Sequence, residues 1–191
     1  MKVRDSGMPQ EQYWASFFNV ELALDTLIPE PDRNGNWIEI GCGYGTFSLP
    51  VARHLKGKLS SFDIEPEMVE RVNRLVKQQA LTNLVAIDRD VVQLGTGEDD
   101  QSHSGVIIYN LLHLENPIAL LTEAYRNLKV GGCLSVIHWR SDIDTPRGPS
   151  LDIRPTPEQT MQWMEKAGFQ NIKLVDIEQS CPYHYGVLAW R

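Results

Sequence analysis

The feature that most constrains the fold is residues 37–50, WIEIGCGYGTFSLP, where a short apolar run meets three glycines at alternate positions. The apolar run is too short for a helix and has the residue types of a buried strand. The glycines let the backbone turn sharply and approach a ligand closely. Apolar residues then recur at roughly helical spacing from Leu49, and Pro50 favours a helix start near Ser48. The pattern predicts a strand, a glycine turn and a helix whose free N–H groups face a ligand.

The glycine spacing separates two kinds of cofactor site. A dinucleotide fingerprint, GxGxxG, needs a small residue at position 46, where this chain has Thr46. The pattern here is ExGxGxG, with Glu39 two places before Gly41. It resembles the first motif of the class I S-adenosylmethionine-dependent methyltransferases, and the resemblance extends from Trp37 to the C-terminus. It implies that the glycine loop holds the methionine part of S-adenosyl-L-methionine, that Glu39 helps to place it, and that S-adenosyl-L-homocysteine is the product.

A second acid follows at the end of the next expected strand, residues 59–64. Asp63 lies 22 positions after Gly41, which suits a carboxylate that accepts hydrogen bonds from both ribose hydroxyls of the cofactor. Glu65 is the competing candidate for this role. A turn acid that touches no ligand is the alternative for both.

A third acid follows the strand expected at residues 84–87. The resembled family has an acid and an apolar residue beside the adenine at this point, which indicates Asp90 and Val91, with Asp88 as the alternative acid. The cofactor contacts that the resemblance implies are Glu39, Gly41, Cys42, Gly43, Gly45, Asp63, Ile64, Asp90, Val91 and Asn110.

The most strand-like stretch, residues 105–112, carries Asn110 near its end and is followed by His113. In the resembled family this strand tip faces the methyl group and the acceptor. Methyl transfer is one in-line displacement, so the protein mainly positions the reactants. A hydroxyl or thiol acceptor also needs a base, and we predict His113 or His138, with Tyr109 and His184 as poorer candidates. The alternatives are a turn side chain for Asn110 and a structural histidine at position 113.

Alternating strands and helices end in two strand candidates, residues 169–177 and 185–190, whose direct reversal makes them antiparallel. We therefore predict an α/β fold: a Rossmann-like three-layer sandwich with a seven-stranded, mostly parallel sheet, a reversed last strand and helices on both faces. The length favours a single domain over residues 1–191. Within it, residues 1–35 form an N-terminal helical lid or cover, and residues 36–191 form the cofactor-binding core.

Two further segments bear on the ligand site. Residues 9–28 suit an amphipathic helical segment, whose Tyr13 and Trp14 either pack in the core or lie over the cofactor as a lid. Residues 140–156 leave the carboxyl end of a parallel strand, where ligands bind in open α/β sheets. The arginines of this loop could bind an acceptor carboxylate or phosphate, or could be solvated surface residues. They are Arg140, Arg147 and Arg154.

The net charge of −7 argues against non-specific electrostatic binding to nucleic acid or to an anionic membrane. The sequence also lacks the Asn-Pro-Pro-aromatic signature of DNA amino-methyltransferases after the fourth strand. We therefore expect a small-molecule acceptor, no nucleic acid partner and no membrane association. No stretch has the length of a signal core or a membrane span, so a cytoplasmic location is expected. Cys42, Cys133 and Cys181 show no metal-ligand spacing, so we expect free thiols and no metal.

Two alternatives to methyl transfer remain at this point. One is an NAD(P)-binding oxidoreductase on the same kind of fold, against which Thr46 weighs. The other is a catalytically silent protein that binds S-adenosylmethionine. The oligomeric state and the identity of the acceptor do not follow from the sequence.

Overall fold

A computed structural model of the protein describes residues 9–191. Seven strands form one sheet in the order β3-β2-β1-β4-β5-β7-β6. Every neighbouring pair is parallel except those of β7, which runs antiparallel to both β5 and β6. The predicted fold class is confirmed. The strands are β1 (Trp37–Ile40), β2 (Leu59–Asp63), β3 (Leu84–Asp88), β4 (His103–Tyr109), β5 (Leu128–Trp139), β6 (Gln170–Val175) and β7 (His184–Trp190).

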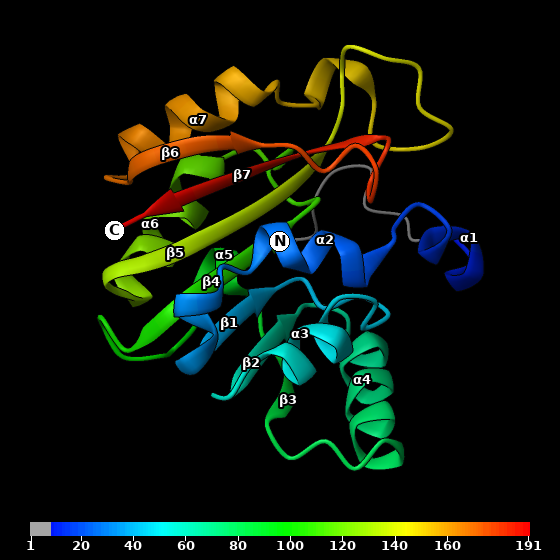
Figure 1. Cartoon of the computed structure of the whole chain (residues 1–191), viewed down its shortest axis with the longest axis vertical. Helices are drawn as coiled ribbons and strands as arrows, with labels where there is room; N and C mark the ends of the chain where they lie inside the picture. Colours follow the sequence, from blue (N-terminus) through cyan, green and yellow to red (C-terminus); the bar gives the residue numbers. More distant parts are fainter. Residues whose placement is uncertain (1–8) are drawn as a thin grey trace.

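Helices cover both faces of the sheet, and each face has its own hydrophobic cluster. Helices α2, α3 and α4 pack on one face, and α2 and α3 lie in front of the strands in Figure 1. Helices α5, α6 and α7 pack on the other face. The helices are α1 (Glu11–Ala15), α2 (Val20–Leu27), α3 (Ser48–His54), α4 (Pro66–Gln78), α5 (Val91–Leu94), α6 (Pro117–Asn127) and α7 (Pro157–Lys166), with 3-10 turns η1 (Glu30–Asn34) and η2 (Leu151–Ile153).

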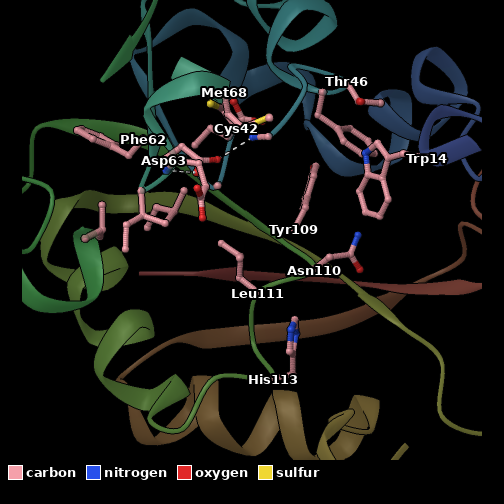
Figure 2. Close-up of a pocket in the computed structure, with 18 of the residues that line it drawn as sticks. Trp14, Cys42, Thr46, Phe62, Asp63, Met68, Tyr109, Asn110, Leu111 and His113 are labelled. Atoms are coloured by element: carbon pink, nitrogen blue, oxygen red, sulfur yellow. Dashed lines mark hydrogen bonds between the residues drawn. The ribbon is translucent and has the colours of Figure 1, made fainter. Parts of the chain in front are cut away.

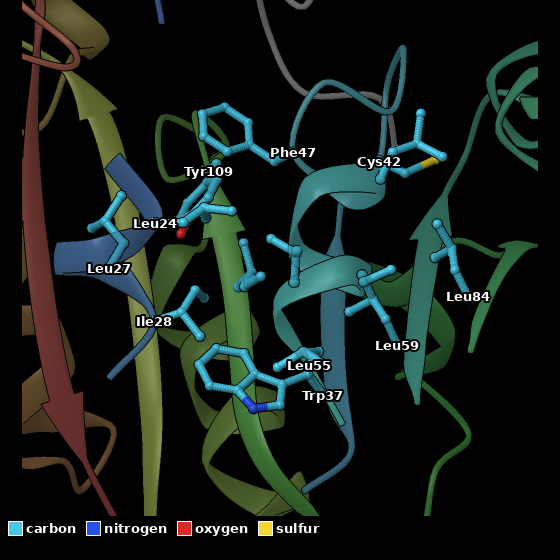
Figure 3. Packing of buried hydrophobic residues seen from close by; sticks show 14 of the residues in the cluster. Leu24, Leu27, Ile28, Trp37, Cys42, Phe47, Leu55, Leu59, Leu84 and Tyr109 are labelled. Carbon is cyan, nitrogen blue, oxygen red and sulfur yellow. The ribbon is translucent and has the colours of Figure 1, made fainter. Parts of the chain in front are cut away.

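Trp37 anchors the first cluster at the start of β1 (Figure 3). Its ring is fully buried, and its indole N–H donates to the carbonyl of Asp32 at 2.9 Å. A Cβ on Gly105 of the neighbouring β4 would lie 2.1 Å from this ring, so the ring fits only because residue 105 is glycine. Strands β1 and β4 are thereby held side by side in parallel register.

This pairing creates the switch point of the sheet. From β1 the chain moves to β2 and β3 on one side and then crosses to β4 and β5 on the other side. The crevice beyond the carboxyl ends of such strands is where open α/β sheets bind ligands. The fold therefore predicts a ligand site beyond Ile40 and Tyr109.

The N-terminal segment differs from the single helical segment expected over residues 9–28. It forms two helices, because the chain turns tightly after α1 and Asn19 caps a new helix by accepting from the N–H of Leu22. The predicted start of α3 near Ser48 is confirmed. Pro50 then lies in the first turn, where its missing N–H would have had no helical partner.

The sequence of residues 130–132, Val-Gly-Gly, suggests a turn between a helix and the next strand, but the structure differs. Helix α6 ends at Asn127, and β5 begins at once with Leu128. The register between β4 and β5 jumps from His103–Leu128 to Gly105–Cys133, so the glycines lie in an irregularity within the strand rather than before it. Helix α5 is an element that the sequence patterns did not indicate. Over the described part of the chain, no helix is long and apolar enough to cross a membrane.

Candidate functional site

A cleft of about 320 Å³ opens at the carboxyl ends of β1, β2 and β4 (Figure 2). Its volume lies within the range of small-molecule sites. Predicted residues that line it are Glu39, Gly41, Cys42, Gly43, Asp63, Ile64, Asp90, Val91, Asn110, His113, Trp14, Arg147, Glu65 and Tyr109. Gly45 lies just beyond its wall, in the turn into α3, and has a φ of +82°.

The glycine loop is held open by its backbone conformation. Gly41 has a φ of +88°, and a Cβ there would lie 2.7 Å from the Leu111 side chain. Gly43 also has a positive φ, and its N–H donates to Oδ2 of Asp63 at 2.8 Å. The loop is thereby fastened to the end of β2, and Gly41 and Gly43 line the cleft with backbone because they have no side chains.

Asp63 holds two backbone segments at once. Its Oδ2 accepts from Gly43, while its Oδ1 accepts from the N–H of Glu65 at 3.0 Å. Each carboxylate oxygen has a second lone pair, so the side chain can still accept from ligand hydroxyls. Asp88 pairs with Asp63 across β2 and β3 but does not line the cleft. Asp63 and Glu65 therefore remain the acids that could meet a ribose.

Glu39 is a buried carboxylic acid at the floor of the cleft. Burial raises its pKa to about 7, against smaller opposing effects from Ser48 and then Ser61. The Ser61 hydroxyl donates to Oε2 of Glu39 at 2.6 Å. The group can hold a positively charged or N–H-bearing ligand as a carboxylate, because such a ligand favours the ionised form.

Asp90 and Val91 begin α5 at the β3 side of the cleft. Oδ1 of Asp90 accepts from the N–H of Gln93 at 3.1 Å and caps the helix. Val91 is buried beside it and contributes an apolar surface. Asp88, the alternative acid for this position, is outside the cleft.

Asn110 follows β4 with a φ of +58°, a left-handed conformation that asparagine tolerates better than most residues. Its backbone N–H donates to the carbonyl of Ile137, which fixes the turn. The side-chain oxygen and nitrogen are buried and have no hydrogen-bond partner among residues 9–191. Because a buried amide without partners is costly, these atoms favour a polar ligand group in the cleft. Figure 2 shows Asn110 between Tyr109 and His113.

The two histidines predicted as bases lie in contact, but only His113 lines the cleft. His138 is fully buried behind it, with Nε2 at 3.1 Å from Nδ1 of His113. Burial, followed by the nearby His113, lowers the pKa of His138 to about 3. Nδ1 of His138 lies 3.3 Å from the Trp139 carbonyl, which can only accept, so that nitrogen carries the proton. Nε2 of His138 then accepts from Nδ1–H of His113, and a neutral His113 carries its lone pair on Nε2.

The poorer base candidates are unsuited to the role. Tyr109 lines the cleft, but its hydroxyl is shared with Ser135 at 2.9 Å, and burial raises the pKa of the phenol above its usual range. His184 packs between Phe18 and Trp139 outside the cleft, and burial lowers its pKa well below the usual value.

The arginines of the loop after β5 separate into three different positions. Arg140 forms a two-point ion pair with Asp142, at 3.0 and 2.6 Å. Arg154 is turned into its own loop and donates to the carbonyls of Pro149 and Arg140. Arg147 is the one of the three that lines the cleft.

The N-terminal segment reaches the cleft through Pro9 and Trp14, whereas Tyr13 is 45% exposed and lies outside it. The Tyr44 hydroxyl donates to the Pro9 carbonyl at 2.7 Å, and Arg71 of α4 pairs with Glu11 of α1. The part of the predicted cover that lies in residues 1–8 is outside the described residues.

Several cleft residues were not singled out from the sequence. They are chiefly apolar and reach the cleft from helix starts and turns that also have structural roles, so no motif marks them. Examples are Phe47, Met68, Leu111 and Pro149. All three cysteines are buried free thiols, and in the part of the chain that is described no group of three His, Cys, Asp or Glu side chains could hold a metal ion.

Comparison with known proteins agrees with this geometry. A family model described as "Methyltransferase domain" matches residues 38–132. The chain is 26% identical over 180 residues to a tRNA U34 carboxymethyltransferase of Histophilus somni, covering 86% of this chain and 54% of that protein. It is 27% identical over 142 residues to the chloroplastic 2-methyl-6-phytyl-1,4-hydroquinone methyltransferase 1 of Oryza sativa, and the match covers 72% of this chain and 42% of that protein. The chain thus spans about half the length of the curated relatives it matches.

Among solved structures, the fold is similar to a SAM dependent methyltransferase from Aquifex aeolicus, with a TM-score of 0.76 and 21% identity over 91% of this chain and 89% of the other. The ExGxGxG loop, the acids that follow β2 and β3, and the reversed seventh strand occur together in one chain. The domain match over residues 38–132 and the shared fold, together with these features, confirm the resemblance of this chain to the class I S-adenosylmethionine-dependent methyltransferases.

Proposed function

We propose that this chain transfers a methyl group from S-adenosylmethionine to a small-molecule acceptor. The observation that carries the proposal is the attachment of the glycine loop to Asp63, because it presents open backbone and a carboxylate to the same cleft. The cofactor would supply a methyl carbon already activated by a sulfonium sulfur. Glu39 and the loop around Gly41 would hold its methionine part, and Asp63 its ribose.

The adenine would lie between Asp90 and Val91 at the start of α5. The cap of that helix uses Oδ1 of Asp90, and a carboxylate can accept further bonds from an amino group. Val91 offers an apolar surface to the base. The side chains present therefore suit each part of the cofactor.

His113 would be the base for an acceptor that must lose a proton. Its Nδ1–H points to His138, so its Nε2 is the nitrogen that can take the proton. His138 is a positioning residue, because it fixes the tautomer and orientation of His113 without lining the cleft. The net charge of −7 supports a small acceptor over a polyanion. The tRNA U34 carboxymethyltransferase of Histophilus somni, to which the chain is similar, makes tRNA the competing acceptor.

The experiment is a calorimetric titration of the protein with S-adenosylmethionine, S-adenosylhomocysteine and NADH, beside Asp63→Ala. We expect the first two to bind and Asp63→Ala to weaken them roughly tenfold or more, since a hydrogen bond to a charged group is worth ~1.5 to 3 kcal/mol. Asp88→Ala is the matched control, because Asp88 is the neighbouring strand-end acid outside the cleft. It should leave both affinities unchanged.

Binding of NADH in place of the two adenosyl compounds would contradict the proposal and indicate hydride chemistry. Tight binding of S-adenosylmethionine with no methyl transfer to small molecules or to tRNA would favour the catalytically silent alternative.

A further inference from the structure

The cleft is divided by charge along the edge of the sheet. Its carboxylates all come from the β1, β2 and β3 side, within the described residues that line it. They are Glu39, Asp63, Glu65, Glu67 and Asp90. Arg89 also lies on that side, but its guanidinium donates to the carbonyls of Leu94 and Gly95. The β4 and β5 side carries Asn110, His113, Trp139 and Arg147.

From this division, and building on the methyl transfer proposed above, we propose that the acceptor is a small aromatic hydroxy acid whose anionic group is bound by Arg147. Its ring would lie against Trp14 and Trp139, with its hydroxyl toward Asn110 and His113. The cofactor occupies the acidic half in this arrangement, and the acceptor occupies the half with the cationic side chain.

The loop that carries Arg147 is held in place by Arg154. The Arg154 guanidinium donates to Oγ1 of Thr145 at 2.7 Å and to the Pro149 carbonyl at 2.6 Å, and it lies 5.9 Å over the Trp139 ring. The Thr145 hydroxyl in turn donates to the Arg147 carbonyl at 2.7 Å. The backbone on both sides of Arg147 is therefore fixed before an acceptor arrives, which lowers the entropy cost of binding.

Gly148 makes this close packing possible. Its φ is +133°, and a Cβ there would lie 2.7 Å from the Arg154 guanidinium and 3.1 Å from the Trp139 ring. The backbone at Gly148 can thus pack against the Trp139 ring while the neighbouring Arg147 lines the cleft. Arg140 cannot substitute for it, because Arg140 does not line the cleft.

The walls on this side are aromatic. The rings of Trp14 and Trp139 meet edge to face with their centroids 6.3 Å apart, and both residues line the cleft. Phe47 and Tyr109 line it as well, with a similar edge contact at 4.8 Å. Such surfaces favour a flat ring over an aliphatic chain, because ring pairs gain energy beyond the area that they bury.

The polar groups suit a hydroxyl as the reacting atom. Figure 2 shows Asn110 and His113 at the cleft, where the chain leaves the end of β4. The acceptor oxygen forms a bond to the methyl carbon as the carbon–sulfur bond breaks, and that electron pair remains on sulfur. The hydroxyl proton passes to Nε2 of His113, so charge and atoms balance.

The test uses two probes of matched shape, para-hydroxybenzoate and its neutral amide, para-hydroxybenzamide. Each is titrated by calorimetry into protein saturated with S-adenosylhomocysteine. We expect the acid to bind at least about tenfold more tightly than the amide, since an arginine–carboxylate contact is a strong charge-assisted pair. Arg147→Gln should reduce this preference to about twofold or less, while Arg140→Gln, the matched loop control, should keep it.

The two proposals fail in different ways. If S-adenosylhomocysteine does not bind, the methyl transfer itself is wrong and this inference falls with it. If S-adenosylhomocysteine binds, then equal binding of acid and amide, no binding of either, or a preference that survives Arg147→Gln overturns the inference alone. Methyl transfer to tRNA with no transfer to the acid would overturn it as well.

Discussion

The buried carboxyl group of Glu39 makes the stability of the protein depend on pH. The side chain is 3% exposed, and burial raises its pKa to about 7, from an ordinary 4.5. Between these two values the folded protein keeps a proton that the unfolded chain has lost. The free energy of unfolding therefore falls as the pH rises through this window, and above it the penalty stays constant.

We predict that Glu39→Gln removes this pH dependence, because the amide has a similar shape and no charge to desolvate. The free energy of unfolding of the variant minus that of the parent should be roughly 2 to 3 kcal/mol larger at about pH 8 than at about pH 5. Urea unfolding of both proteins at the two pH values measures it. Glu165→Gln, on the exposed side of α7, is the control and should show no comparable increase. A pH-independent difference for Glu39→Gln would contradict the explanation.

The placement of the predicted residues follows from strand geometry at this same scale. Glu39, Asp63, Asp90 and Asn110 meet in one cleft because each lies in or just after a parallel strand, and the carboxyl ends of these strands share one edge. The sequence could not separate His113 from His138 in the same way. His138 is internal to β5, and only the packing of β7 against that strand shows that it is buried.

At the scale of elements, the strands and the long helices were predictable because their apolar patterns serve one dominant purpose, the burial of a face. The capping box of α7, in which Thr156 and Gln159 bond each other's backbone, follows a local sequence pattern in the same way. The break between α1 and α2 and the early start of β5 were not, since tertiary pairing decides both. The sequence also could not show that only Arg147 of Arg140, Arg147 and Arg154 lines the cleft, because contacts between distant residues decide where each side chain lies.

The attachment of α1 gives a prediction at this scale. We expect Tyr44→Phe to speed the dissociation of S-adenosylhomocysteine about 2- to 10-fold, because the lost hydroxyl bond to Pro9 holds the N-terminal segment at the cleft. The size follows from a net hydrogen-bond contribution of ~0.5 to 1.5 kcal/mol. Stopped-flow measurement of the protein's tryptophan fluorescence gives the rate, because Trp14 and Trp139 line the cleft. Tyr13→Phe is the control, because Tyr13 lies outside the cleft; equal rates in both variants would contradict a covering role.

At the scale of the whole molecule, two hydrophobic clusters pack on the two faces of the sheet, while the polar side chains of the cleft lie at the carboxyl ends of the strands and in the loops that follow. This separation lets the loops differ among relatives on a common sheet, so a relative's acceptor is a weak guide to this one. The overall charge is a more direct guide. A net charge of −7 repels a polyanion at distances where specific contacts have not formed.

We therefore predict that the chain does not bind bulk tRNA at about 0.15 M salt, because it has no excess of positive charge with which to release the counterions of the RNA. Fluorescence anisotropy of labelled tRNA, measured with S-adenosylhomocysteine present, tests this. Binding of S-adenosylhomocysteine in the same buffer is the control that the protein is folded and its cleft intact. Any weak association at about 0.02 M salt should vanish as salt rises. Saturable binding that persists at the higher salt would instead locate a specific RNA site on this acidic molecule, and the small-molecule acceptor would have to be abandoned.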